Sequence, residues 1–171
     1  TVGDTKSRAV PIYQTTSFVF DDTEEAADLF ALRKAGNIYT RITNPTTSVF
    51  EERINALEGG VGALAVASGM AAITYVFLTL AHAGDHIVSG DTLYGESIEI
   101  FTKILGKYGV DVTFVDFTDI EAIKAAVRPN TTLFYGETVA NPVIAVPDIQ
   151  AIADVAHANN AILVIDNTFM T

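Results

Sequence analysis

The sequence predicts an α/β fold with a largely parallel sheet and helices on both of its faces. From residue 61 onward, short apolar segments alternate with longer segments of helical length, a pattern typical of a sheet that is covered on both faces. The clearest unit is the uncharged run 61–81, which reads as a buried strand, a Ser-Gly turn and a helix. With 171 residues, 49% of them hydrophobic and 18% charged, the chain is long and apolar enough to form a core.

An extended arm and two helices are predicted to precede this alternating region. Residues 1–21 show no helical period. The first helix, over 22–36, begins with an acidic N-cap followed three positions later by Glu25, and it ends at a glycine. The second helix, over 45–58, begins with an asparagine cap and a proline at its first position. We therefore expect residues 1–58 to form an N-terminal arm with helices.

Residues 59–171 are expected to be the first part of an α/β domain. A capping box at Thr118 and Glu121 begins one of its helices. In such a sheet, ligands collect at the carboxyl ends of the strands. The predicted strands lie at 63–66, 86–89, 111–115, 131–135 and 161–165, and the predicted helices at 70–81, 95–107, 119–127 and 148–159.

The composition disfavours several classes of partner and site. Ten basic against twenty-one acidic residues give a net charge of −11, which disfavours binding to nucleic acid or to an anionic membrane. Because the chain has no cysteine, disulfides, thiolate metal sites and cysteine nucleophiles are excluded. The three histidines lack metal-ligand spacing, so no metal site is expected.

The run 61–81 is about long enough to span a bilayer. Glycines, a serine and threonines interrupt it, however, and no basic flank follows it, so a buried core segment is the favoured interpretation.

No charged-then-apolar leader opens the chain, and we therefore expect no secretion. The absence of cysteine fits a reducing cytoplasm.

Four kinds of binding group follow the predicted strands at the ligand-binding edge of the sheet. Gly69 and Met70 open a helix whose free N–H groups favour an anion such as a phosphate. Tyr94 offers an aromatic surface, Asn141 an amide and Asp166 a carboxylate. Each of these alone could be an ordinary turn or cap residue, and the turn at Gly69 an ordinary corner between strand and helix. The four together indicate one ligand.

Pyridoxal 5′-phosphate (PLP) carries the matching groups: a phosphate, a flat ring, a polar ring substituent and a nitrogen that can be protonated. A carboxylate beside that nitrogen keeps it protonated, which lets the ring withdraw electrons from a neighbouring carbanion. We therefore predict that PLP is the cofactor of this site.

The same residues resemble the signature series of a known family. In order and spacing they are similar to those of the Cys/Met-metabolism PLP enzymes, the cystathionine γ-synthase-like members of PLP fold type I. That fold has an aspartate-aminotransferase-like large domain. Residues 7–18 of the arm are most similar to the O-acetylhomoserine sulfhydrylase branch. The matching motifs are YTRITNPT at 39–46, ASGMAA at 67–72, YG at 94–95, ETVANP at 137–142 and DNTF at 166–169.

The resemblance implies a role for each candidate residue of the predicted edge. The backbone at Gly69 and Met70 is expected to hold the phosphate, and Asn141 to lie near the ring hydroxyl. Asp166 is expected to pair with the ring nitrogen. Tyr94 is expected to stack on the ring and to act as a catalytic acid and base, because a stacked phenol beside cationic groups can have a lowered pKa.

The resemblance also implies an oligomer. In this family a Tyr-x-Arg pair, here Tyr39 and Arg41, reaches the phosphate held by a neighbouring subunit. Arginine suits that contact because its donors form a fixed fork. We therefore expect a homo-oligomer, a dimer of dimers, with Tyr39 and Arg41 contributed across the interface.

Two features depart from the family pattern. Glu96 follows Tyr94-Gly95 where relatives usually have a second glycine. The family's Schiff-base lysine follows a Ser-x-Thr-Lys motif, and none of the five lysines of this chain has that context. We therefore expect the chain to be an N-terminal fragment that lacks this lysine, the rest of the cofactor domain and the C-terminal domain.

The function implied by the resemblance is a γ-replacement reaction of methionine biosynthesis. A PLP-dependent transferase would convert O-acetyl-L-homoserine, a small amino-acid substrate, and sulfide into homocysteine and acetate. Cystathionine γ-synthase, methionine γ-lyase and cystathionine γ-lyase remain alternatives. From the residues alone, a non-catalytic α/β domain that binds a phosphorylated ligand also remains open.

Overall fold

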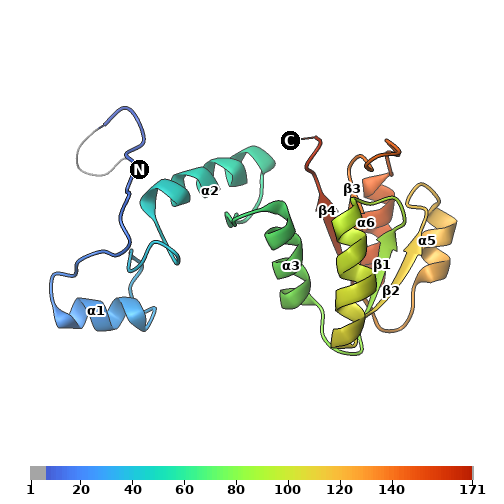
Figure 1. The fold of residues 1–171 in the computed structure, drawn as a ribbon, viewed down its shortest axis with the longest axis horizontal. Helices are drawn as coiled ribbons and strands as arrows, with labels where there is room; N and C mark the ends of the chain where they lie inside the picture. The colour runs from blue at the N-terminus through green and yellow to red at the C-terminus, as the bar shows by residue number, and fades with distance from the viewer. Residues whose placement is uncertain (1–6, 171) are drawn as a thin grey trace. The chain divides into compact units, whose positions relative to one another are not determined.

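A computed structural model describes residues 7–170 and divides the chain into two compact units, Thr1–Val66 and Ala67–Thr171. The first unit contains the arm and two helices, and the second contains the sheet (Figure 1).

Helices α1 (Thr23–Phe30) and α2 (Pro45–Glu58) form the first unit together with the arm. Both begin as predicted, because the side chain of Asp22 accepts from the Glu25 N–H and that of Asn44 from the Thr46 N–H. Helix α1 is shorter than the predicted range 22–36. Its end lies just before Leu32, whose left-handed φ of 57° cannot continue a right-handed helix.

The predicted strand at 63–66 is not formed, and this expectation was wrong. An apolar segment becomes a strand only when another strand pairs with it, and no strand of the described residues pairs with this one. Leu64 is instead 78% exposed. The Ala65 N–H donates to the side chain of Glu51 at 2.8 Å rather than to a neighbouring backbone.

The second unit is built on four parallel strands in the order β2-β1-β3-β4. All four were predicted within two residues at either end. Because they are parallel, their carboxyl ends lie at one edge of the sheet. The strands are β1 (His86–Gly90), β2 (Asp111–Val115), β3 (Thr131–Glu137) and β4 (Ile162–Asp166).

Helices cover both faces of this sheet, which confirms the predicted fold class (Figure 1). On one face α3 (Gly69–Leu80) and the segment after β1 pack on the sheet, and on the other α5 (Ile120–Ala126) and α6 (Ile149–Ala158) do so. Neighbouring strand residues serve opposite faces, as strand geometry requires: Tyr135 packs with α3 and Phe134 with α5 and α6.

Two local predictions for the second unit need correction. The helix expected over 95–107 is regular only in α4 (Gly95–Glu99), and a π-helical turn and a 3₁₀ segment carry the chain on to Tyr108. Helix α5 is capped not by a box at Thr118 and Glu121 but by Asp119, whose carboxylate accepts from the N–H groups of Glu121 and Ala122.

No helix within residues 7–170 is both long and apolar enough to cross a membrane.

Candidate functional site

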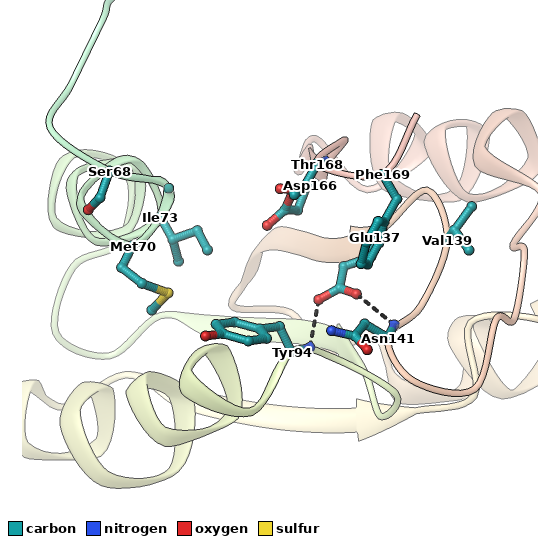
Figure 2. A pocket seen from close by; sticks show the side chains of 11 residues that line it. Ser68, Met70, Ile73, Tyr94, Glu137, Val139, Asn141, Asp166, Thr168 and Phe169 are labelled. Atoms are coloured by element: carbon teal, nitrogen blue, oxygen red, sulfur yellow. Dashed lines mark hydrogen bonds between the residues drawn. The ribbon is translucent and has the colours of Figure 1, made fainter. Parts of the chain in front are cut away.

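One pocket of about 330 Å³ lies at the carboxyl edge of the sheet, in the second unit. It is formed by the start of α3, the loop after β1 and the segments that follow β3 and β4 (Figure 2). It brings together five of the seven residues that the sequence singled out. These are Gly69, Met70, Tyr94, Asn141 and Asp166, and the other lining residues are Ser68, Ile73, Glu137, Val139, Thr168 and Phe169.

The start of α3 gives the pocket an anion-binding end. The Ser68 side chain accepts from the Ala71 N–H at 3.1 Å, and the Ala72 N–H donates to the Ser68 carbonyl. The N–H groups of Gly69 and Met70 come before the first intrahelical bond and so remain available to a ligand. A Cβ placed on Gly69 would meet no atom within 4 Å, so space lies open beside this backbone.

Tyr94 follows β1 at the N-cap of α4 and is 43% exposed. The sequence led us to expect cationic neighbours and a lowered pKa for its phenol. Within this chain the neighbour is anionic instead: hydrogen bonding to Glu96 and the charge of that carboxylate raise the pKa of Tyr94. The departure from the family pattern at Glu96 therefore bears directly on the candidate acid and base.

Asp166 is the last residue of β4, and its side chain points into the pocket (Figure 2). Its Oδ1 accepts from the N–H of Thr168 at 3.0 Å and from the hydroxyl of that residue. Its Oδ2 lies 3.5 Å from the Tyr135 hydroxyl. Burial raises the pKa of the Tyr135 phenol, and the nearby carboxylates of Asp166 and Glu137 raise it further, so this hydroxyl stays protonated. Oδ2 can therefore still accept a hydrogen bond from a ligand.

Glu137 is a pocket residue that the sequence reasoning did not single out. It ends β3, is 7% exposed, and pairs in register with Asp166 on β4. Its Oε1 accepts from the Tyr94 N–H at 2.7 Å and its Oε2 from the Asn141 N–H at 3.2 Å (Figure 2). The available signal was an acidic residue that closes an otherwise uncharged strand, TTLFYGE.

The charges of the lining fit PLP. Two carboxylates, Glu137 and Asp166, stand side by side on neighbouring strands, and the lining contains no lysine, arginine or histidine within the described residues. Carboxylates in such a place favour a cation, whereas the α3 end favours an anion. A ligand with a phosphate and a protonated ring nitrogen satisfies both ends, and Tyr94 supplies a surface for the ring.

Tyr39 and Arg41, the other two candidate residues, belong to the first unit. Tyr39 forms an isolated antiparallel bridge with Ser17. The guanidinium carbon of Arg41 lies 5.4 Å from the centre of the Tyr39 ring, within the range of a cation–π contact. The two residues therefore lie together, and their role at a phosphate stays a prediction.

Comparison with known proteins identifies relatives over almost the whole chain. It is 52% identical to the O-acetyl-L-homoserine sulfhydrylase of Corynebacterium glutamicum over 168 residues, which is 98% of this chain and 38% of that protein. It is 46% identical to an L-methionine γ-lyase of Fusobacterium nucleatum, over 95% of this chain and 42% of the relative.

A solved structure gives the same fold. The putative O-acetylhomoserine (thiol)-lyase of Campylobacter jejuni, which carries N′-pyridoxyl-lysine-5′-monophosphate, matches with a TM-score of 0.92 at 34% identity. The match covers 98% of this chain and 42% of that one. These relatives place the fold in PLP fold type I. The chain spans about two fifths of the length of the relatives it matches.

A sequence model of the family matches residues 2–171. The chain therefore belongs to the Cys/Met metabolism PLP-dependent enzymes.

Proposed function

We propose that the complete protein is a PLP-dependent O-acetylhomoserine sulfhydrylase, which makes homocysteine and acetate from O-acetyl-L-homoserine and sulfide. The observation that carries the proposal is the pocket, in which an anion-binding helix start faces two carboxylates across an aromatic side chain. The 52% identity to a sulfhydrylase favours this member of the family.

Each candidate residue has a defined task in this proposal. The N–H groups of Gly69 and Met70 bind the phosphate, and Asp166 uses Oδ2 to hold the proton on the ring nitrogen. The Tyr94 ring stacks on the cofactor, and the Asn141 amide lies near the ring hydroxyl. When bound, PLP supplies an electron sink for negative charge that develops on the substrate.

Tyr94 is also the proposed acid and base, with the phenol oxygen as the atom that carries the proton. In this chain Glu96 favours the protonated phenol. A cationic group of the cofactor or substrate would oppose Glu96 and make the proton easier to remove. The pKa of Tyr94 then depends on the balance between these two influences.

The assembly and location are proposals as well. We propose that Tyr39 and Arg41 bind the phosphate of a neighbouring subunit in a dimer of dimers, and that the protein works in the cytoplasm. The pairing of Arg41 with the Tyr39 ring supports the first point, because it leaves the guanidinium fork free to bind an anion.

A substrate panel tests the proposed activity. The complete protein, loaded with PLP, is assayed with O-acetylhomoserine and sulfide, and separately with methionine alone. Formation of homocysteine and acetate with little reaction of methionine is the expected result. Efficient breakdown of methionine would favour the second candidate, a methionine γ-lyase, to which the chain is 46–47% identical. Turnover of neither substrate would contradict both.

A further inference from the structure

We propose that Glu137 is a positioning residue that connects the Tyr94 and Asn141 segments and so sets the width of the ring-binding site. The inference rests on the proposed function, since it concerns the two side chains that face the ring. It assigns to Glu137 no contact with substrate or cofactor. Glu137 acts through the two residues whose backbones it holds.

The contacts of Glu137 divide evenly between the two segments. Oε1 accepts from the N–H of Tyr94, which is 43 residues away in the chain, at 2.7 Å. Oε2 accepts from the N–H of Asn141 at 3.2 Å. Figure 2 shows the two bonds leaving the two oxygens of one carboxylate. Because both donors are backbone groups, the bonds fix where each Cα lies and hence where each side chain begins.

A rigid part of the sheet supports this carboxylate. The backbone of Glu137 pairs in register with Asp166. The preceding residue, Gly136, lies so close to Phe117 that a Cβ there would come within 2.6 Å of the ring. A side chain on a closely packed strand positions its partners more accurately than one on a free loop.

Burial of Glu137 also indicates a specific role. The residue is 7% exposed, and a buried carboxylate costs free energy unless it is paired or fully hydrogen-bonded. A residue that served only to pack the end of β3 would be apolar. Charge-assisted bonds to N–H groups are about twice as strong as neutral ones, which suits a residue that must hold two segments in one arrangement.

The two adjacent carboxylates then have separate tasks. The oxygens of Glu137 are directed to backbone N–H groups, whereas among residues 7–170 the hydrogen-bond partner of Asp166 Oδ2 is the Tyr135 hydroxyl, at the long distance of 3.5 Å. Asp166 therefore remains the residue for the ring nitrogen. Glu137 makes no bond to the ring and positions it through Tyr94 and Asn141.

The substitution Glu137→Gln tests this role in the complete protein. Glutamine keeps the size of the side chain, but one carboxylate oxygen becomes an NH₂ donor that faces a backbone N–H. Loss of one charge-assisted bond of this kind should weaken PLP binding to the apoprotein by about tenfold or more. The visible circular dichroism of bound PLP should also change, because it reports the orientation of the ring. The matched control is Glu121→Gln, on the exposed surface of α5, where Glu121 contacts Lys124.

A double variant separates positioning from simple stabilisation. Tyr94→Ala removes the ring of one of the two residues that Glu137 is proposed to place, so Glu137→Gln should weaken PLP binding less in that background than in the wild type. A general loss of stability would instead weaken binding equally in both backgrounds. Thermal unfolding of each apoprotein shows whether the variants are folded.

Each outcome bears on one of the two proposals. A wild-type complete protein that binds no PLP defeats the proposed function itself. The positioning role is overturned if the wild type binds PLP and the Glu137→Gln variant binds it with equal affinity and unchanged circular dichroism. It is also overturned if Glu137→Gln weakens PLP binding equally in the wild-type and Tyr94→Ala backgrounds. If Glu137→Gln does not fold, Glu137→Asp is tested in the same titrations. The shorter acid keeps its charge but cannot reach both N–H groups, so it too should weaken PLP binding.

Discussion

At the scale of single residues, the site depends on where carboxylates meet backbone N–H groups and hydroxyls. Glu137 and Asp166 are register partners on β3 and β4, yet their contacts differ completely. Glu137 accepts from the Tyr94 and Asn141 segments, whereas Asp166 is oriented by Thr168 through Oδ1. Two acids at the ends of neighbouring strands thus provide one positioning group and one group that is available to a ligand.

Asp166→Ala should damage chemistry much more than folding. Asp166 ends a strand and points into the pocket rather than into either core cluster. Without it the ring nitrogen loses the group that keeps it protonated, and turnover should fall by about a hundredfold or more. Steady-state kinetics and the PLP content of the complete protein measure the two effects.

The control for this change is Asp154→Ala on the exposed side of α6, where Asp154 accepts a hydrogen bond from Gln150. It should leave turnover near that of the wild type. Near-normal turnover in Asp166→Ala would mean that Asp166 only caps the turn at Thr168.

Glu96→Gln should move the pH dependence that Tyr94 controls. The carboxylate of Glu96 raises the pKa of Tyr94 by favouring the protonated phenol. Removal of that charge lowers the pKa, so any step that needs the phenolate should reach its full rate at a lower pH. The pH profile of kcat for the complete protein measures this change. The limb of the profile that is lost in Tyr94→Phe is the one that reports the titration of Tyr94.

Glu99→Gln is the matched control for Glu96→Gln, because Glu99 lies on the same helix and pairs with Lys103. It should leave the Tyr94 limb in place. A limb that stays fixed or moves to higher pH in Glu96→Gln would show that Glu96 does not act on the phenol.

At the scale of elements, the sequence was most informative where a local pattern determines the structure. Side-chain caps at Asp22 and Asn44 begin the two helices of the first unit as expected, because a cap depends on residues two or three positions away. The four strands that form were visible in the sequence as short apolar segments between helical segments.

Features that depend on distant partners could not be predicted in the same way. Residues 63–66 are as apolar as the other predicted strands, but pairing requires a neighbouring strand, which a local pattern does not specify. After α4 the chain continues as a π-helical turn and a 3₁₀ segment, from which Phe101 and Leu105 pack into the core; the apolar pattern of the sequence did not distinguish these segments from a regular helix. The role of Glu137 was not predicted because its partner Tyr94 lies 43 residues away.

The candidate site was predictable to a larger extent, and for a physical reason. Parallel strands bring their carboxyl ends to one edge, so residues that follow different strands could be grouped before their contacts were known. Gly69, Tyr94, Asn141 and Asp166 indeed line one pocket. The raised pKa of Tyr94 was not foreseen, because the effect of Glu96 depends on side-chain placement within α4.

At the scale of the whole molecule, residues 7–66 of the first unit include few buried apolar side chains. Helix α2 has no buried residue, and Phe50 and Leu57 on it are 56% and 82% exposed. Apolar helix surfaces of this kind are typical of segments that are covered in a larger assembly. This fits the proposed role of Tyr39 and Arg41 between subunits.

A mixing experiment tests that role. Complete subunits carrying Arg41→Ala are combined with subunits inactivated at the cofactor-binding lysine. If Arg41 acts on a neighbouring subunit, a mixed dimer joins an intact arginine to an intact lysine, and part of the activity should return. If Arg41 acts within its own chain, every site stays defective and no activity returns. Arg53→Ala, on α2, replaces Arg41→Ala in a control mixture and should leave the activity of its own subunits unchanged.

The central claim, that the pocket at the carboxyl edge of the sheet binds PLP, is tested most directly by titrating the complete apoprotein with the cofactor. We predict that visible absorbance of bound PLP develops and saturates at one equivalent per chain, and that the wild type retains the cofactor through gel filtration. A complete, folded protein that neither gains this absorbance nor retains PLP after reconstitution would contradict the account.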